Sequence, residues 1–68
     1  MQELYRIAQN LKRLRQECGY TQSYVAERIG IRYQSYHAYE AGTTVPTLRN
    51  FIALAKLYDV PLDELIAP

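Results

Sequence analysis

The sequence predicts an all-α protein, with five short helices in one domain that spans residues 1–68. Three observations favour this fold. Apolar residues recur three and four positions apart through most of the chain, which is the spacing of one helix face. No stretch alternates apolar and polar residues over a useful length, so no strand is expected. Each of the three glycines stands directly after a helical pattern, where a left-handed residue commonly ends a helix.

The first half of the chain predicts three helices. The first covers residues 3–18 and ends at Gly19, and its apolar side consists of Leu4, Ile7, Leu11, Leu14 and Cys18. The second follows an N-cap at Thr21 and closes at Gly30. Its inward residues are Val25, Ala26 and Ile29. The third covers residues 32–41 and stops at Gly42.

The second half predicts two more helices. Thr47 is expected to cap the fourth. Its apolar stripe consists of Leu48, Phe51, Ile52, Ala55 and Tyr58. Pro61 suits the first position of a short fifth helix, and Asp63 and Glu64 suit its positive end. The apolar side of this last helix consists of Leu62, Leu65 and Ile66.

Composition excludes several classes of protein. With 49% hydrophobic and 22% charged residues, the 68-residue chain has the make-up of one small globular domain. The longest apolar run, residues 51–55, is far shorter than the ~20 residues of a membrane helix, and no secretory signal is evident, so a cytoplasmic protein is expected. One cysteine and one histidine predict no disulfide, metal site or cofactor. Most Lys and Arg residues fall in residues 1–32, which is compatible with one basic face.

Gly30 and Ile31 alone link the second and third predicted helices. So short a link forces the two helices to cross steeply, as in a helix-turn-helix unit. The small side chain of Ala26 lets their axes approach closely. Because the second helix of such a unit normally lies in the DNA major groove, the pattern indicates a DNA-binding unit.

Residues 11–66 resemble the lambda-repressor-like, Cro-type helix-turn-helix regulators of bacteria and phages. The marks of the resemblance are Leu11, Leu14, Arg15, Thr21-Gln22, Val25-Ala26, Gly30-Ile31, Glu40, Gly42, Pro46 and the closing "VPLDEL". The resemblance implies a repressor-like transcriptional regulator that binds double-stranded DNA sequence-specifically. It would bind a palindromic operator as a homodimer, with its third helix in the major groove.

The resemblance also implies roles for single residues. Gln22 would hold a DNA phosphate together with backbone N–H groups, where the helix dipole favours an anion; an exposed helix former without a role is the alternative. Arg15 and Glu40 would form a structural ion pair, with a direct role in DNA binding as the alternative. Tyr36 and Tyr39 would bury their rings in the core and leave their hydroxyls near its edge.

Base-reading positions, by resemblance, fall on Tyr33, Gln34 and Ala38, with Arg32 and His37 beside them. Gln34 has the clearest chemistry, because an amide both donates to and accepts from adenine. Arg32 suits guanine or phosphate, and Ala38 suits a thymine methyl. Surface packing of Tyr33 and simple solvation of His37 remain open. Contacts with the DNA backbone are expected from Thr21, Gln22, Tyr24, Ser35, Thr43 and Thr44.

Two features depart from the family pattern. Arg32 stands where Ser or Thr usually caps the third helix, and the loop after Gly42 reads Thr43, Thr44, Val45 in place of basic or amide residues. Phosphate binding by this loop would therefore rest on hydroxyls and backbone N–H groups.

The sequence also predicts a homodimer interface and bears on the class of protein. Leu62, Leu65 and Ile66 exceed what one small core needs, so they are the expected homodimer interface. A protein-interaction module of the same fold, such as an antitoxin partner, is the alternative function. No enzyme is expected and no catalytic residue is assigned, because the sequence offers no nucleophile with a base and no phosphate-cradling glycine loop.

Overall fold

A computed structural model describes residues 2–68 as four α-helices and one 3₁₀ helix. The elements are α1 (Gln2–Cys18), α2 (Gln22–Ile29), α3 (Tyr33–Ala41), α4 (Leu48–Tyr58) and η1 (Leu62–Leu65). Residues 2–68 contain no strand, so the all-α prediction is confirmed. The predicted fifth helix is wrong in type, because η1 is a 3₁₀ helix of four residues. Within the same range, no helix is long and apolar enough to cross a membrane.

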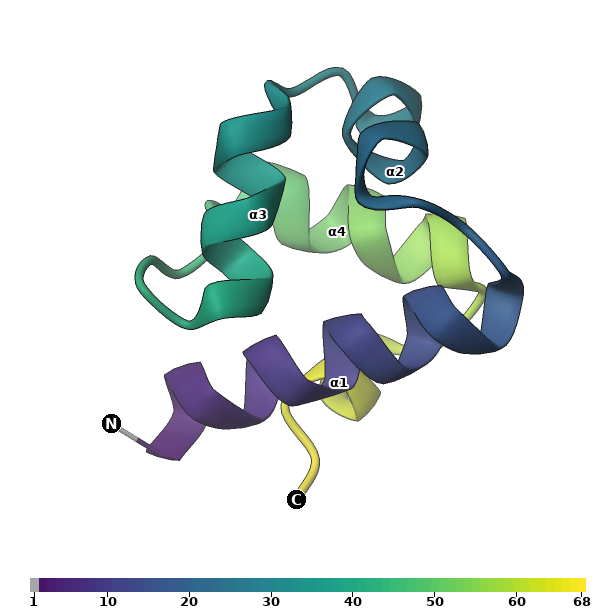
Figure 1. The fold of residues 1–68 in the computed structure, drawn as a ribbon. Helices are drawn as coiled ribbons and strands as arrows, with labels where there is room; N and C mark the ends of the chain where they lie inside the picture. The colour runs from purple at the N-terminus through teal and green to yellow at the C-terminus, as the bar shows by residue number, and fades with distance from the viewer. Residues whose placement is uncertain (1) are drawn as a thin grey trace.

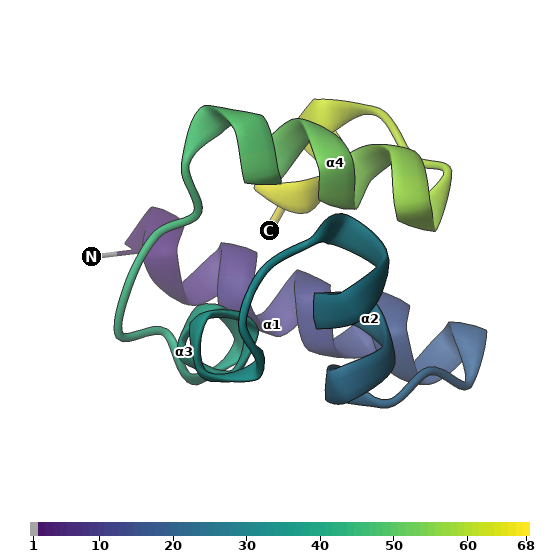
Figure 2. The ribbon, with the colours of Figure 1, turned by 90° about the horizontal axis from the view of Figure 1, so that it is seen from above.

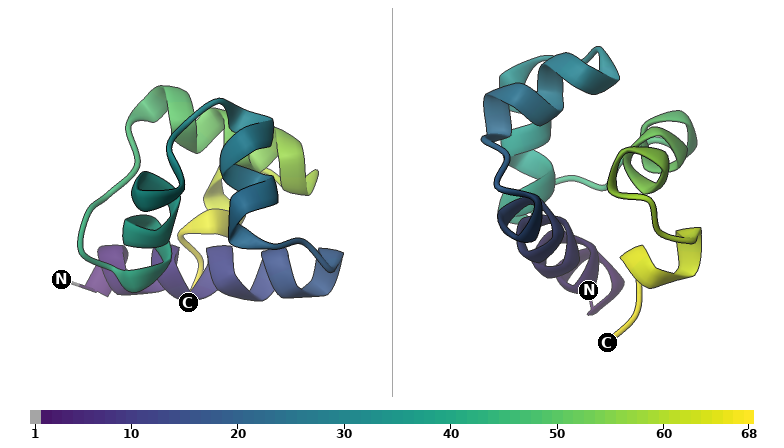
Figure 3. Two further views of the ribbon diagram at one scale, coloured as in Figure 1. Left: turned by 45° about the horizontal axis from the view of Figure 1, so that its top comes forward. Right: turned by 90° about the vertical axis from the view of Figure 1, so that its right-hand side faces the viewer.

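The helices form two layers around one core. In Figure 1, α1 runs along the bottom, α3 stands above it, and α2 lies beside α3. The view from above in Figure 2 places α4 behind this group. The right-hand view of Figure 3 shows α1, α2 and α3 on one side and α4 with η1 on the other. The outer faces of α2 and α3 are therefore left uncovered on the side away from α4.

Apolar side chains from all five elements fill the space between the layers. The largest fully buried ones are Tyr36, Leu11, Leu54, Leu65 and Val25. Ala26 is 2% exposed, as expected for a small residue at the contact of α2 with α3. Burial of this apolar surface is the main stabilising contribution to so small a domain.

The predicted caps of α2 and α4 are confirmed. The hydroxyl of Thr21 accepts a hydrogen bond from the N–H of Tyr24 at 3.0 Å, and that of Thr47 accepts one from Asn50 at 3.2 Å. At the start of α3, Arg32 makes no side-chain capping bond, as its side chain predicts.

A left-handed residue follows each of the four α-helices, and after α1 it is Gly19. Gly30 has φ 75° after α2 and Gly42 has φ 76° after α3, a region that favours glycine. Asp59 ends α4 with φ 57°, so this helix end carries no glycine to mark it. Aspartate tolerates this conformation better than most residues, because its short polar side chain can hydrogen-bond locally.

Two predicted core positions at helix ends are wrong. Leu48, the first residue of α4, is 71% exposed, and Cys18, the last residue of α1, is also exposed. The core position missing from the predicted stripe of α4 is Leu54, which is fully buried. Leu54 follows Phe51 by three positions and precedes Tyr58 by four, so it lies at the centre of the same helix face.

A buried tyrosine pair corrects the prediction for Tyr36. The rings of Tyr36 and Tyr39 are buried as expected, but the Tyr36 hydroxyl does not reach the edge of the core. It lies 2.8 Å from the hydroxyl of Tyr58 in a buried hydrogen bond. The two phenols thus satisfy each other away from water. The Tyr39 hydroxyl accepts a hydrogen bond from the side chain of Asn50 at 2.9 Å.

This pair predicts a loss of stability at alkaline pH. Burial raises the pKa of Tyr58 to about 12 and raises the pKa of Tyr36 as well. A raised pKa means that the stabilisation is complete below the ordinary phenol pKa of about 10 and is lost as the pH rises through the folded values. We expect the urea midpoint to fall as the pH rises from about 10 to about 12, and to fall less in Tyr58→Phe. Tyr5→Phe, at a 65% exposed position, should behave as wild type. Equal alkaline losses in all three proteins would contradict this account.

A buried amide attaches the last residues of the chain to α1. The side-chain nitrogen of Asn10 donates hydrogen bonds to the carbonyl oxygens of Leu65 and Ala67, at 3.0 and 2.8 Å. Asn10 is the buried polar residue of the core. Because both of its donors bind main-chain carbonyls, the segment after η1 is held against α1.

Candidate nucleic-acid interface

The turn between α2 and α3 fixes the angle between these two helices. The Gly30 N–H donates to the carbonyl of Glu27 at 3.2 Å, and the Ile31 N–H donates to the carbonyl of Ala26 at 2.9 Å. Gly30 is needed for its positive φ, since a Cβ built there would meet no atom within 4 Å. This turn places the N-terminal end of α3 at an outer corner of the molecule (Figure 1).

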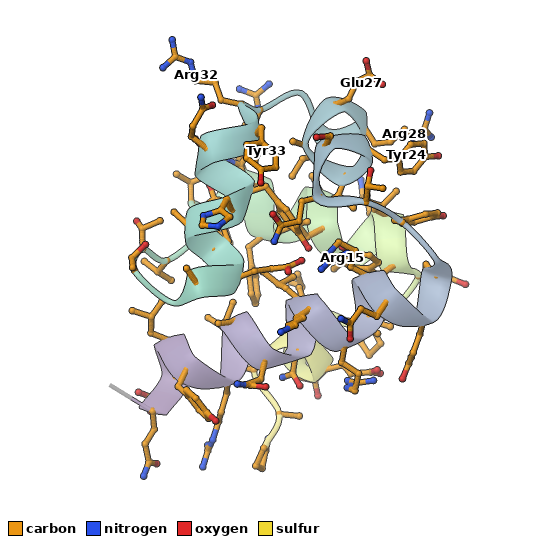
Figure 4. All side chains as sticks on the ribbon, viewed as in Figure 1. Arg15, Tyr24, Glu27, Arg28, Arg32 and Tyr33 are labelled. Atoms are coloured by element: carbon orange, nitrogen blue, oxygen red, sulfur yellow. The ribbon has the colours of Figure 1, made fainter. Side chains whose placement is uncertain are left out.

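Most of the predicted base-reading residues lie on the open side of α3. Arg32, Gln34 and His37 are exposed, Tyr33 is 46% exposed, and Ala38 is half-buried. Figure 4 shows Arg32 pointing away from the molecule beyond the start of α3. No hydrogen bond or ion pair from another residue in 2–68 engages the side chains of Arg32 or Gln34. Their donors and acceptors are therefore free for a ligand.

Tyr33 and His37 lie one helical turn apart on α3. Their ring centroids are 5.9 Å apart and the rings are tilted by 39°. Such a contact stiffens both side chains on the exposed surface. The ring contact is compatible with surface packing of Tyr33 and also with a role of Tyr33 in binding.

The predicted Arg15–Glu40 ion pair is present, and it joins α1 to α3. Arg15 Nε lies 2.6 Å from one carboxylate oxygen of Glu40, and Arg15 Nη2 lies 3.1 Å from the other. The third bond of the guanidinium runs from Nη1 to the carbonyl of Tyr20 at 2.9 Å. The side chain of Glu40 is only 4% exposed and that of Arg15 is 15% exposed. This bidentate, enclosed geometry makes the pair a structural element of the fold.

The electrostatics of Glu40 reflect these partners. Burial favours its neutral form, but hydrogen bonds from Arg15 and Gln22 and the charge of Arg15 together hold the pKa of Glu40 below its ordinary value. The hydrogen bond to Glu40 likewise raises the pKa of Arg15, although burial opposes it. Both groups are thus ionised at neutral pH.

Gln22 takes part in the same network. Its side-chain nitrogen donates to Glu40 at 3.0 Å, a contact that the sequence analysis did not foresee. An amide nitrogen carries two donors, so one N–H of Gln22 remains available to a second acceptor. Gln22 is the first residue of α2, where unpaired backbone N–H groups also favour an anion.

A polar pocket of about 290 Å³ opens beside Gln22. Its lining residues are Lys12, Arg15, Gln22, His37, Glu40 and Ala41. Because Arg15 and Glu40 neutralise each other, Lys12 gives the pocket a net positive charge. Lys12 was not predicted as a site residue. Its spacing of three positions from Arg15 places both side chains on one face of α1, and this spacing could have indicated it. The pocket also places His37 with Gln22, near the start of α2.

The residues predicted to contact the DNA backbone differ in exposure and position. Thr21, Thr43 and Thr44 are exposed, while Ser35 is half-buried. The Thr43 hydroxyl donates to the carbonyl of Ala38 at 3.3 Å, at the C-terminal end of α3. Tyr24 is 40% exposed, and its ring centroid lies 4.7 Å from that of Tyr20. Figure 4 places Tyr24 on the side of α2 away from α3, apart from the other candidates.

The predicted dimer interface is wrong in one of its three residues. Leu65 is fully buried in its own core and so is closed to a second chain. Leu62 is 43% exposed and Ile66 is 38% exposed. Leu62 also lines a mainly apolar groove of about 380 Å³ between α4 and η1, with Ile52 and Val60 on its walls.

Comparisons with known proteins agree with this geometry. A sequence model of the helix-turn-helix family matches residues 11–65. The chain is 41% identical over 58 residues to an uncharacterised helix-turn-helix transcriptional regulator, YobD, from Bacillus subtilis, which covers 85% of this chain and 52% of the relative. It is 35% identical over 60 residues to RstR, a transcriptional repressor of the cryptic phage CTXphi from Vibrio cholerae, with 88% of this chain and 54% of the relative covered. The chain thus spans about half the length of the curated relatives it matches.

A solved structure shares the whole fold. The restriction-modification controller protein C.AhdI from Aeromonas hydrophila superposes with a TM-score of 0.87 at 28% identity, covering 96% of this chain and 98% of that one. The matched family model covers the helix-turn-helix unit and the helices that support it. The chain belongs to the helix-turn-helix family, in the lambda-repressor-like, Cro-type group that its sequence resembles.

Proposed function

We propose that this protein is a transcriptional regulator, repressor-like, that binds double-stranded DNA sequence-specifically. The observation that carries the proposal is the open side of α3, where the side chains of Arg32 and Gln34 are exposed and have no partner among residues 2–68. Names of relatives support the same class, since they include transcriptional regulators and a phage repressor. In this proposal α3 enters the major groove and its side chains read base edges.

The start of α2 would hold the DNA backbone. Gln22 has one free amide N–H, and Lys12 and His37 line the same pocket. A phosphate placed there would meet a lysine, an amide donor and the positive end of α2. We therefore assign His37 to phosphate contact in preference to base reading. The exposed hydroxyls of Thr21, Thr43 and Thr44 would contact phosphates on either side.

Selection of bound sequences from random duplex DNA tests the proposal. We expect one enriched motif with two-fold symmetry and half-sites about one DNA turn apart. Binding to that motif should weaken steeply as salt rises, because phosphate contacts release counterions. Absence of any enriched motif, or affinity that does not change with salt, would contradict DNA reading.

Dimerisation on DNA is the second part of the proposal. Leu62 lines the groove between α4 and η1, and Ile66 directly follows η1. Both are exposed, so their burial against a second copy would remove apolar surface from water. Sedimentation with a full palindrome should therefore show two chains per duplex. Leu62→Lys with Ile66→Lys should shift the stoichiometry towards one chain, whereas Tyr5→Lys, on the exposed side of α1, should leave two. One chain per duplex in the unmodified protein would rule this interface out.

A further inference from the structure

A groove of about 460 Å³ lies between the end of α2 and α4. Its lining residues are Arg28, Ile29, Arg49, Ala53, Lys56 and Leu57. The apolar members Ile29, Ala53 and Leu57 are half-buried, so they form a partly open floor. The remaining members are three cations, and no carboxylate lines the groove. The groove therefore combines an apolar floor with a positive rim.

Ion pairing within the fold does not explain the cations of this rim. Within residues 2–68, neither of the two ion pairs involves Arg28, Arg49 or Lys56. Arg28 and Lys56 lie in the last turns of their helices, where the helix dipole favours a positive charge. Arg49 is different, because it is the second residue of α4 and no acidic residue accompanies it in the first turn. A cation at that end is disfavoured by the dipole.

The groove is separate from the surface proposed to bind DNA. Gln22 and Thr21 stand at the start of α2, whereas Arg28 and Ile29 form its last turn. Figure 4 shows Arg28 projecting from the side of α2 away from α3, while Arg32 extends beyond the start of α3. The right-hand view of Figure 3 shows α4, the other wall of the groove, on the opposite side of the molecule from α3. A ligand in the groove and DNA along α3 would use different faces.

We infer that this groove binds an acidic segment of a partner protein that also carries apolar side chains. Carboxylates would pair with the three cations, and an apolar side chain would cover Ile29 and Leu57. A DNA phosphate fits less well, because phosphate offers nothing to the apolar floor. The inference goes beyond DNA binding and does not depend on it, and it gives a definite surface to a protein-interaction role.

Nuclear magnetic resonance on the full chain tests the inference with defined probes. The first probe is a short helical peptide of Glu and Leu, with leucines three and four apart. The second is the same peptide with Gln in place of every Glu. We expect the acidic peptide to shift the amide signals of Ile29, Ala53 and Leu57, and the neutral peptide to bind more weakly. The loss of two rim cations in Arg28→Gln/Arg49→Gln should weaken the acidic peptide about tenfold.

The matched control is Arg6→Gln/Arg13→Gln, which removes the same charge from α1. It should bind the acidic peptide within about twofold of wild type, since screening limits distant charges. Circular dichroism would establish that both double variants are folded. Equal weakening in both, equal binding of the two peptides, or shifts spread over α1 and α3 would overturn the inference. So would two other results: groove shifts caused by duplex DNA alone, or concentration-dependent groove shifts without peptide, which would identify a second copy as the occupant.

Discussion

Arg15→Ala should unfold this protein at a much lower temperature than the wild type, even without DNA. The substitution leaves Glu40 as an unpaired carboxylate that is only 4% exposed, and it also removes the donor to the Tyr20 carbonyl. Breaking one side of an enclosed ion pair costs about 3 kcal/mol, the lower end being apt because Arg15 is partly exposed. For a domain of this size, that loss lowers the melting temperature by more than about 10 °C.

A second arginine on the same helix supplies the control. Arg13 forms an exposed pair with Glu17 at 3.3 Å, one helical turn away, and both side chains are largely open to water. Such a pair contributes about 0.3–0.5 kcal/mol, so Arg13→Ala should shift the melting temperature only slightly. Thermal melts of both variants, followed by circular dichroism, make the comparison. Similar melting temperatures for the two variants would mean that the Arg15–Glu40 pair does not support the fold.

The contribution of the Arg15–Glu40 pair should also be seen in how stability depends on pH. The pKa of Glu40 is lowered in the folded state, so its stabilisation is present above the ordinary glutamate pKa and is lost as the pH falls through the folded value. The wild type should therefore lose stability on acidification below about pH 4.5. Glu40→Gln should be less stable at neutral pH and should lose less on acidification. An acid profile identical to that of the wild type would contradict the lowered pKa.

Local signals in the sequence predicted much of this fold. The caps at Thr21 and Thr47 act within one helical turn, so their residue types were sufficient to place them. Leu48 and Cys18 were misplaced because helix periodicity does not reveal where a neighbouring element stops covering a helix. Leu65 was predicted to lie in a dimer interface for a related reason. The sequence does not show that η1 is a short 3₁₀ helix whose Leu65 side chain is fully buried in the core.

The polar contacts of the site were harder to predict. The Tyr36–Tyr58 bond joins residues 22 positions apart, and the Gln22–Glu40 bond joins residues 18 apart. Neither spacing carries a local signal, because both depend on how the helices pack. Lys12 shows the same limit. Its charge is evident in the sequence, but its place in one pocket with Gln22 depends on how the helices pack.

Gln34→Ala and Gln22→Ala should impair DNA binding in different ways. Gln34 is exposed near the start of α3 and has no intramolecular partner among residues 2–68. A bidentate amide–adenine contact discriminates by about 1–3 kcal/mol, so its loss should lower affinity for the selected site by about 10- to 100-fold. Binding to a scrambled duplex should change little. Preference should relax at one base pair in each half-site.

Gln22→Ala should weaken the selected and the scrambled duplexes alike, because a phosphate contact carries no sequence information. It should also lower the melting temperature somewhat, since Glu40 loses a hydrogen bond. Binding must therefore be measured below the melting range of each variant and at one salt concentration, because phosphate contacts make affinity salt-dependent. The ratio of the two affinities, selected over scrambled, separates the roles. It should fall for Gln34→Ala and stay constant for Gln22→Ala, and a constant ratio in both variants would mean that α3 does not read bases through Gln34.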